Sequence, residues 1–515
     1  MAANLHTVTP NPEKEQYGAY VGRLARGAGI SFFGQGMGRF LNYITQIALA
    51  WMYGPAQFGA YALGITLVQM ANILAQLGID NGVVRYVAHY RTQRDVARVR
   101  GTILVALGVP FALSVVLTCA MFFGAGFLAK EIFGDPSLKT MFKLFSISLP
   151  ALTVMNMALF ATQGFMNQRY TAYVQQILQP LANLALIVVL YFLGAQILGA
   201  AAAYIVSMLV GSVLALYCLY QVFPKSAAQE SPARFETRAL LNASWPMTVF
   251  SFMQRANYWV AVLVLGIFAT TSAVGIFNAA ARTAALAALV LYAFNGIFSP
   301  MISSLYGRGQ LNDLGRLYQD VSRWVFLGGF AVFLLTVLLG KELMGVFGPE
   351  FVAGSTVLVI LAGGELFNSA VGPTQRVLSM TRHQKVLMFA TAGSAVLCVG
   401  ANFALVPGYG MLGAAVATAS ATAVANVVTV LYVRRLLGVW PFNYGYAKPA
   451  VAGLLAAAGV YLGKLVFPFS DAIPVILVFA PLFLVGLMAA LLTLGLSSSD
   501  RHLLKAISKP FRSHA

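Results

Sequence analysis

The stretch ISFFGQGMGRFLNYITQIALAWM, residues 30–52, decides the fold class because it is long and apolar yet contains polar residues along one face. An α-helix that crosses a bilayer needs about 20 mostly apolar residues. Polar residues in this stretch recur at intervals of three or four, which places them on one helical face: Ser31, Gln35, Arg39, Asn42 and Gln46. The stretch therefore predicts a membrane-spanning helix whose polar stripe faces protein or water rather than lipid.

The composition extends this prediction to the whole chain. Of the 515 residues, 59% are hydrophobic and only 9% are charged, and the mean hydropathy is +0.78. A soluble domain carries about 25% charged residues, so the composition excludes a soluble enzyme and also a disordered protein. It predicts an all-α, polytopic membrane protein.

The net charge of +18 reflects 33 lysines and arginines against 15 acidic residues. In a soluble protein such an excess points to nucleic acid, whereas in a membrane protein it marks the loops that stay in the cytoplasm. We therefore expect no nucleic-acid partner.

Apolar runs long enough to span the membrane recur along the chain and number about fourteen. They lie near residues 28–50, 58–79, 101–124, 140–162, 171–193, 197–221, 242–267, 273–303, 321–340, 352–374, 386–406, 411–432, 448–467 and 473–496. With a cytoplasmic N-terminus, the basic run 85–100 and most other basic residues fall in cytoplasmic segments. This asymmetry predicts a multi-pass protein of the cytoplasmic membrane with both termini in the cytoplasm.

The order of these runs predicts two lobes of six helices around a central cavity, followed by two extra helices. The expected regions are a cytoplasmic tail with an interfacial amphipathic helix (1–27), an N-lobe (28–221), a cytoplasmic linker (222–241), a C-lobe (242–432), two peripheral helices (433–496) and a basic cytoplasmic tail (497–515). A shift of the chain by about 216 residues superposes Arg39 on Arg255 and Gly59 on Gly275, which suggests an internal repeat. In transporters built from such repeats, the substrate site lies between the halves, near the middle of the membrane.

Three arginines, Arg39, Arg255 and Arg282, lie deep inside predicted spans. A charge at the bilayer centre costs about 2.5–3.5 kcal/mol on insertion scales, so each must face a cavity or a partner. Because Glu365 is the only acid well inside a span, a cavity with excess positive charge is expected to bind an anionic substrate group. The alternative is that these arginines are paired with backbone carbonyls or lipid phosphates.

Other polar residues are expected to line the same cavity: Gln35, Asn42, Gln46, Gln69, Asn72, Gln76, Gln176, Asn257, Asn278 and Asn368. Hydrogen bonds between helices are the alternative role for each of them. Arg85 is a candidate for contact with substrate at the cytoplasmic mouth. Glu365 is a candidate site for proton or sodium coupling, or else a member of a structural ion pair.

Neither catalytic nor metal-binding residues are expected. The cysteines are isolated, the histidines fall in predicted loops and tails, and neither forms a metal-binding spacing. A membrane-embedded glycan polymerase or glycosyltransferase needs a sizeable loop or an acidic metal-binding pair. The longest internal loop predicted here has about 20 residues, within the range of ordinary connections, so a transporter without a cofactor is favoured over an enzyme.

The segment YGPAQFGAYALGITLVQMANILAQLGIDNGVVRYVAHY, residues 53–90, resembles the polysaccharide transporter family of oligosaccharide flippases. A similar pattern occurs in 272–310, where SAVGIFNAAART is followed by FSPMISSLYGRGQ. These flippases belong to the superfamily of multidrug, oligosaccharidyl-lipid and polysaccharide exporters. The resemblance extends over roughly residues 20–495.

The resemblance implies alternating-access transport of an isoprenoid-diphosphate-linked oligosaccharide to the outer leaflet, for the synthesis of a cell-surface polysaccharide such as an exopolysaccharide or lipopolysaccharide. It assigns the diphosphate and anionic sugars to Arg39, Arg255 and Arg282. The implied partners are this lipid-linked oligosaccharide, membrane lipids, a glycan polymerase and glycosyltransferases. A lipid II flippase or a multidrug/cation antiporter of the same fold remains the alternative, although the scarcity of intramembrane acids weighs against drug export.

Overall fold

The computed structural model describes residues 12–223, 232–467 and 471–495, and the side chains from residue 36 onward with a few exceptions. All regular elements in these ranges are helical, as the sequence predicted. The first part contains α1 (Pro12–Gln76), α2 (Ile79–Thr92), α3 (Val96–Phe127), η1 (Leu128–Ile132), α4 (Leu138–Gly164), η2 (Thr171–Leu178), α5 (Gln179–Phe192) and α6 (Ile197–Val222).

The second part begins with α8 (Thr237–Phe268), α9 (Thr271–Ala284), η3 (Ala285–Ala287), α10 (Ala288–Gly307), α11 (Leu311–Gly345), η4 (Pro349–Gly354) and α12 (Ser355–Val371). It continues with α13 (Thr374–Met380), α14 (Gln384–Leu437), η5 (Tyr444–Tyr446), α15 (Ala447–Val466) and α16 (Ala472–Thr493). The predicted amphipathic segment belongs to the helical start of α1, but its side chains lie outside the described ones. Residues 1–11 of the predicted N-terminal region 1–27 and the whole predicted basic tail, 497–515, also lie outside the described residues.

Eleven helical segments in the described ranges are long and apolar enough to cross a membrane. This confirms a multi-pass membrane protein, while the count of about fourteen spans stays a prediction. Two of the eleven, at 36–76 and 384–437, contain 41 and 54 residues. At about 1.5 Å per residue they are roughly two and nearly three times as long as the ~30 Å hydrocarbon core.

Both long segments are interrupted at a glycine. Gly54 has φ 71° and ψ 174°, and Gly410 has φ 53° and ψ −130°. A side chain would be strained at these positive φ values, so glycine lets the chain leave the helical path at these points. The interruptions fall between runs 28–50 and 58–79 and between runs 386–406 and 411–432, where the sequence predicted loops.

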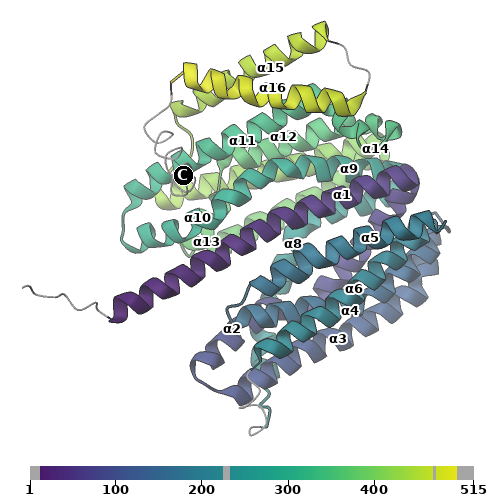
Figure 1. The fold of residues 1–515 in the computed structure, drawn as a ribbon, viewed down its shortest axis with the longest axis vertical. Coiled ribbons are helices and arrows are strands. Elements are labelled where there is room, and N and C mark those ends of the chain that lie inside the picture. The colour runs from purple at the N-terminus through teal and green to yellow at the C-terminus, as the bar shows by residue number, and fades with distance from the viewer. Residues whose placement is uncertain (1–11, 224–231, 468–470, 496–515) are drawn as a thin grey trace, which may run out of the picture.

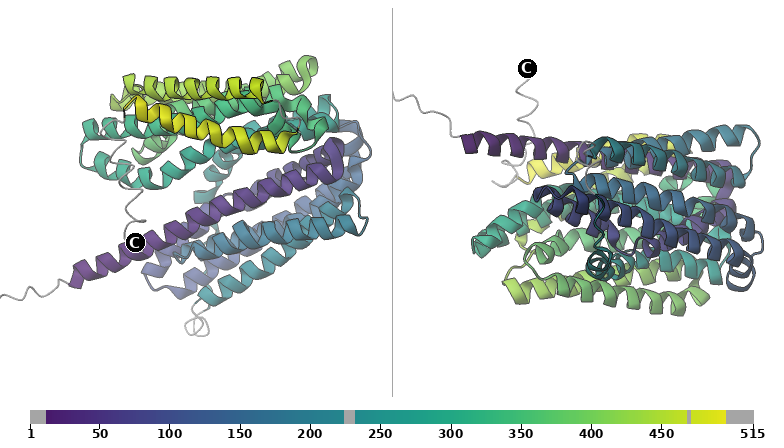
Figure 2. Two further views of the ribbon diagram at one scale, coloured as in Figure 1. Left: turned by 45° about the horizontal axis from the view of Figure 1, so that its top comes forward. Right: turned by 90° about the horizontal axis from the view of Figure 1, so that it is seen from below.

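The helices form two groups (Figure 1). Helices α3, α4, α5 and α6 lie on one side of the molecule, α10 to α16 lie on the other, and α1 runs between the groups. Helices α15 and α16 pack against α11 and lie at the outer edge, far from α3 to α6 (Figures 1 and 2). We keep the names N-lobe and C-lobe for residues 28–221 and 242–432.

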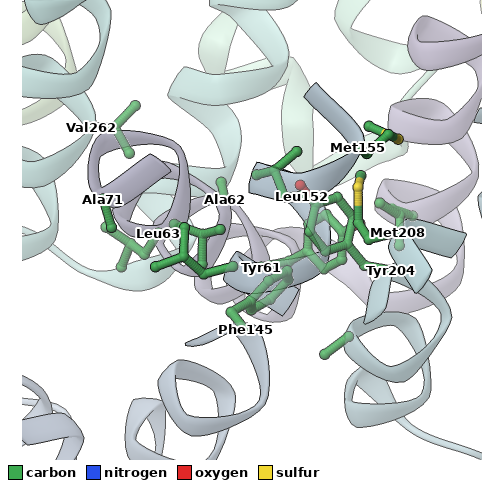
Figure 3. Packing of buried hydrophobic residues seen from close by; sticks show 14 of the residues in the cluster. Tyr61, Ala62, Leu63, Ala71, Phe145, Leu152, Met155, Tyr204, Met208 and Val262 are labelled. Carbon is green, nitrogen blue, oxygen red and sulfur yellow. The ribbon is translucent and has the colours of Figure 1, made fainter. Parts of the chain in front are cut away.

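Aromatic side chains form the centre of the N-lobe core (Figure 3). The ring centroids of Tyr61 and Phe145 lie 5.1 Å apart, and those of Phe145 and Tyr204 lie 5.5 Å apart. These rings come from α1, α4 and α6, and Val262 of α8 belongs to the same buried cluster. The core of the N-lobe therefore continues into the first helix after the linker.

The lobes meet where α1 passes α9. A Cβ atom added to Gly59 would lie 1.8 Å from the carbonyl oxygen of Thr271, and one added to Gly275 would lie 2.1 Å from that of Pro55. Only glycine permits this backbone approach, because a Cβ occupies the space that the opposite chain already fills. The two glycines are the pair that the 216-residue shift superposes.

The linker ends on the N-lobe at the turn between α2 and α3. Glu236 accepts a hydrogen bond from the hydroxyl of Tyr90 and pairs with Arg98 at 3.1 Å. Burial and the Glu236 carboxylate raise the pKa of Tyr90 to about 12, so its hydroxyl remains a donor at neutral pH. The backbone N–H of Arg234 also donates to the carbonyl of Ala97 at 3.0 Å. The described end of the predicted linker is thus fixed to the N-lobe.

Candidate functional site

A cavity of about 780 Å³ lies within the C-lobe. Its lining comes from α8, α10, α12, α13 and α14 and the turns between them, all within residues 247–426. This volume is in the range of about 300–1,000 Å³ that is usual for small-molecule sites. The sequence placed the site between the lobes, whereas the lining of this cavity belongs to one lobe.

The lining is rich in groups that both donate and accept hydrogen bonds. Carboxamides from all five helices or their ends contribute to it: Gln254, Asn257, Asn295, Asn368, Gln375, Gln384 and Asn426. Hydroxyl groups add further donors and acceptors: Ser379, Thr391, Ser394 and Thr422. Among the described lining residues there are two cations, Arg376 and Lys385, and no carboxylate.

Hydrogen bonds hold one wall of the cavity in place. The Nδ2 of Asn257 donates to Ser394 Oγ at 3.0 Å, and Ser394 Oγ donates to the carbonyl of Ala421 at 3.0 Å. This chain joins α8 to both parts of the interrupted helix α14. The Oδ1 of Asn257 is buried and has no partner among the described residues, so its hydrogen-bonding capacity is only partly used.

Arg376 and Lys385 lie on α13 and at the start of α14, and both are exposed. Sequence reasoning assigned them only to the control of topology, because they fall in a predicted cytoplasmic loop. Helix α13 is a seven-residue helix between α12 and α14. No pattern in the sequence predicted that this helix lies beside the cavity.

Arg39 lies at the edge of the cavity. Its guanidinium carbon is 4.1 Å from the ring centroid of Tyr292, a cation–π contact between α1 and α10. Tyr292 lines the cavity, and Arg39 is partly buried beside it. Arg39 is therefore in side-chain contact with a described lining residue.

Arg255 is exposed on α8 and does not line the cavity, although the preceding Gln254 does. Its charge acts on the carboxylate of Asp80, at the start of α2 in the N-lobe. The Oδ1 of Asp80 is buried without a hydrogen-bond partner among the described residues. Sequence reasoning missed Asp80 as the acidic neighbour of Arg255, because the two residues lie on different lobes.

Arg282 lies near the contact between the lobes. Its guanidinium carbon is 5.2 Å from the ring centroid of Tyr258, and its Nε is buried with no partner in the described part of the chain. The hydroxyl of Tyr258 donates to Asn278 Oδ1, and Asn278 Nδ2 donates to Gln46 Oε1 at 3.3 Å. Two predicted lining residues, Gln46 and Asn278, thus meet each other across the lobes.

Glu365 lies one helical turn before Asn368, on α12. The Nδ2 of Asn368 donates to Glu365 Oε2 at 3.3 Å. Asn368 lines the cavity and Glu365 does not. Within the described ranges no ion pair joins Glu365 to an arginine. The alternative that Glu365 belongs to a structural ion pair therefore has no support there.

The remaining predicted residues have separate surroundings. The Oδ1 of Asn72 accepts from Thr153 Oγ1 at 3.0 Å inside the N-lobe, and Asn42 Nδ2 donates to the carbonyl of Gly38 at 2.8 Å. Gln176 has a buried Oε1 without a described partner. Gln76 is buried, Gln69 is partly buried and Arg85 is exposed. The side chain of Gln35 lies outside the described ones.

Among the described residues, no group of histidine, cysteine, aspartate and glutamate could hold a metal ion. Within those residues, the site thus offers carboxamides, hydroxyls and cations for direct binding of a substrate. The carboxamides and cations suit a ligand that combines hydroxyl groups with negative charge.

The chain shows sequence similarity to glycan-related proteins. The family described as "Polysaccharide biosynthesis protein" matches residues 24–306. A protein of Haloferax volcanii, described as a probable low-salt glycan biosynthesis flippase, is 30% identical over 264 residues. That match covers 51% of this chain and 55% of the relative, so the chain spans about half the length of the curated relative.

Solved structures of two transporters share the fold. The lipid II flippase MurJ, in an inward closed conformation, has a TM-score of 0.70 at 13% identity and covers 88% of this chain and 97% of its own. An inward-facing multidrug resistance MATE family transporter of the MOP superfamily has a TM-score of 0.68 at 17% identity, with 80% and 98% covered. At these identities the likeness establishes the fold alone.

Proposed function

Because the chain belongs to the polysaccharide biosynthesis protein family, we propose that it is a flippase for an isoprenoid-diphosphate-linked oligosaccharide. It moves the glycan from the cytoplasmic to the outer leaflet of the cytoplasmic membrane for cell-surface polysaccharide synthesis. Both termini are in the cytoplasm in this proposal. A glycan polymerase and glycosyltransferases are the expected neighbouring activities.

The C-lobe cavity is the structural observation that supports this proposal. A glycan head that enters hydrocarbon loses its hydrogen bonds to water, which costs roughly 2–7 kcal/mol for each unpaired polar group. The carboxamides and hydroxyls of the lining replace those bonds, and Arg376, Lys385 and Arg39 offset the charge of the phosphates. The isoprenoid tail remains in the bilayer.

Alternating access is part of this proposal, and the two lobes in contact at α1 and α9 are the parts that would move. The lobes rock so that the cavity opens first to one side of the membrane and then to the other. A carrier of this kind transports its substrate chemically unchanged, so no catalytic residue is required. The described lining supports a sugar lipid over a cationic drug, because it presents cations and no carboxylate.

Glu365 is the proposed site of proton or sodium coupling. It is an acid inside the C-lobe, it is hydrogen-bonded to the lining residue Asn368, and no described arginine pairs with it. A change in its charge is therefore transmitted to the cavity through Asn368. The proposal that Glu365 couples transport to an ion gradient does not depend on which substrate the protein carries.

The proposed function is tested with purified protein in liposomes that contain a fluorescent polyprenyl-diphosphate oligosaccharide. Translocation is measured as the gain of access of the glycan to an impermeant glycosidase. Arg39→Gln and Arg376→Gln are expected to lower the rate about 10- to 100-fold, since a charge-assisted hydrogen bond contributes about 1.5–3 kcal/mol.

Arg308→Gln is the matched control, because Arg308 is an exposed cation at the end of α10 outside the cavity lining. A wild-type rate no higher than that of protein-free liposomes contradicts the proposed function. Wild-type rates in both Arg39→Gln and Arg376→Gln contradict the role of these arginines.

A further inference from the structure

Two chemically different sets of polar groups lie at different depths of the cavity. Arg376 and Lys385 lie where α12, α13 and α14 join, in a segment of the chain expected at the cytoplasmic side. Asn257 and Ser394 lie deeper. Ser394 is nine residues beyond Lys385 on α14, which is about 14 Å along the helix axis.

The two sets suit different parts of one ligand. A phosphate oxygen only accepts hydrogen bonds, so it needs donors such as guanidinium and ammonium groups. A sugar hydroxyl both donates and accepts, and a carboxamide matches it because it presents an acceptor oxygen and two donor N–H groups. The deep wall contains carboxamides and hydroxyls, whereas both described cations lie at the joining segment.

Two lining carboxamides retain an unused acceptor. The Oδ1 atoms of Asn257 and Asn295 are buried and have no hydrogen-bond partner among the described residues. An unpaired buried acceptor costs about 1–3 kcal/mol, and a hydroxyl donor removes that cost. Asn426, on the second part of α14, is buried in the same lining at 3% exposure.

We propose that the C-lobe cavity is a saccharide subsite in which Asn257, Asn295 and Asn426 bind the hydroxyls of the sugars nearest the lipid, while Arg376 and Lys385 bind the phosphates. This proposal rests on the proposed function and adds to it the residues that determine specificity for the glycan. A site built to hydrogen-bond a hydroxyl rejects ligands that lack it, because its polar groups are then left unpaired. Specificity for the sugar therefore resides in the C-lobe.

Binding of two kinds of probe to the full chain in detergent separates the two sets of residues. One probe is a bare polyprenyl diphosphate, and the other is the same lipid carrying glucose, galactose or N-acetylglucosamine. The wild type is expected to bind at least one glycosylated lipid about 10-fold or more tightly than the bare lipid.

Asn257→Leu and Asn426→Leu are expected to remove this preference while leaving the affinity for the bare lipid within about twofold. Asn295→Leu, at a partly buried position, provides a second variant if a buried substitution prevents folding. Arg376→Gln and Lys385→Gln are expected to weaken the binding of every probe about 10-fold or more.

Two control variants match the size and charge of these changes. Gln179→Leu removes a carboxamide that donates to Ser207 Oγ at 3.2 Å inside the N-lobe, far from the lining. Arg308→Gln removes an exposed cation outside the lining. Both are expected to bind all probes as the wild type does.

The outcomes distinguish the two proposals. If the wild type binds neither bare nor glycosylated lipid, the proposed function fails. If it binds every probe with one affinity, or if the leucine variants weaken bare and glycosylated lipids equally, the saccharide subsite is wrong and the flippase function stands.

Discussion

Arg39 and Arg282 each lie against a tyrosine ring, whereas Arg255 has a carboxylate as its neighbour. Arg39 lies against the ring of Tyr292 at the cavity edge, Arg255 interacts with Asp80 of the other lobe, and Arg282 lies beside Tyr258 near the lobe contact. A guanidinium over an aromatic face keeps its donors free for a ligand, because the ring engages the flat face of the cation. Because Tyr292 lines the cavity and Tyr258 does not, Arg39 is the arginine best placed to meet an anionic head.

Glu365→Gln tests ion coupling at the scale of one residue. The amide keeps the size of the side chain and an oxygen that accepts from Asn368, but it cannot take up a proton or carry a charge. Translocation in liposomes is expected to lose its dependence on an imposed proton or sodium gradient.

The control for Glu365→Gln is Glu342→Gln. Glu342 pairs with Lys464 at 2.7 Å on α11 and α15, away from the cavity. This variant is expected to keep the gradient dependence. Unchanged dependence in Glu365→Gln rejects Glu365 as the coupling site.

At the scale of elements, the contact of α1 with α9 requires a residue without a side chain at two positions. Gly59 and Gly275 let the backbones of α1 and α9 meet without intervening side chains. Beside them, the hydroxyls of Tyr43 and Thr283 share a hydrogen bond of 3.0 Å, and Asn278 donates to Gln46. The contact therefore combines close packing with hydrogen bonds that must break when the lobes separate.

Gly59→Val is expected to hold α1 and α9 apart, because the first carbon of the new side chain would fall 1.8 Å from the Thr271 carbonyl oxygen. A cysteine at Thr283, which is 2% exposed, reports on the separation. Its reaction with an impermeant thiol reagent is expected to become about 10-fold faster, in keeping with a population shift toward separated lobes.

Gly124→Val provides the comparison on α3, because a Cβ atom at Gly124 would meet nothing within 4 Å. The reaction rate at position 283 should stay at the wild-type value in this variant. Equal rates in Gly59→Val and Gly124→Val would mean that the glycine contact does not control the approach of the lobes.

At the scale of the whole molecule, the distribution of basic residues predicts how the chain is placed in the membrane. The turn between α10 and α11 carries Arg308 and is expected in the cytoplasm, whereas the turn between α5 and α6 has no basic residue and is expected outside. Gln310 and Gln196 are exposed in these two turns.

The placement is tested in a variant that lacks Cys119, Cys218 and Cys398. A cysteine introduced at Gln196 is expected to react in intact cells with an impermeant thiol reagent. A cysteine at Gln310 is expected to react only after the membrane is opened. The reverse pattern would overturn the orientation.

The sequence by itself determined the membrane environment, the helical architecture and the family resemblance. Each of these depends on residues that are close together in the chain. The spacing of Ser31 to Gln46 places a polar stripe on one helical face through the geometry of a single helix. The same local spacing identified Asn257 and Asn368, which line the cavity.

Only the tertiary structure decided which polar groups share a cavity. Asn257, Asn295, Arg376 and Asn426 come together because α8, α10, α13 and α14 pack around one space, and no periodicity encodes that packing. The electrostatic interaction of Arg255 with Asp80 and the contact of Gly59 with Gly275 also join distant parts of the chain. Helical geometry fixes the face on which a side chain lies, but the packing of separate helices fixes what that face meets.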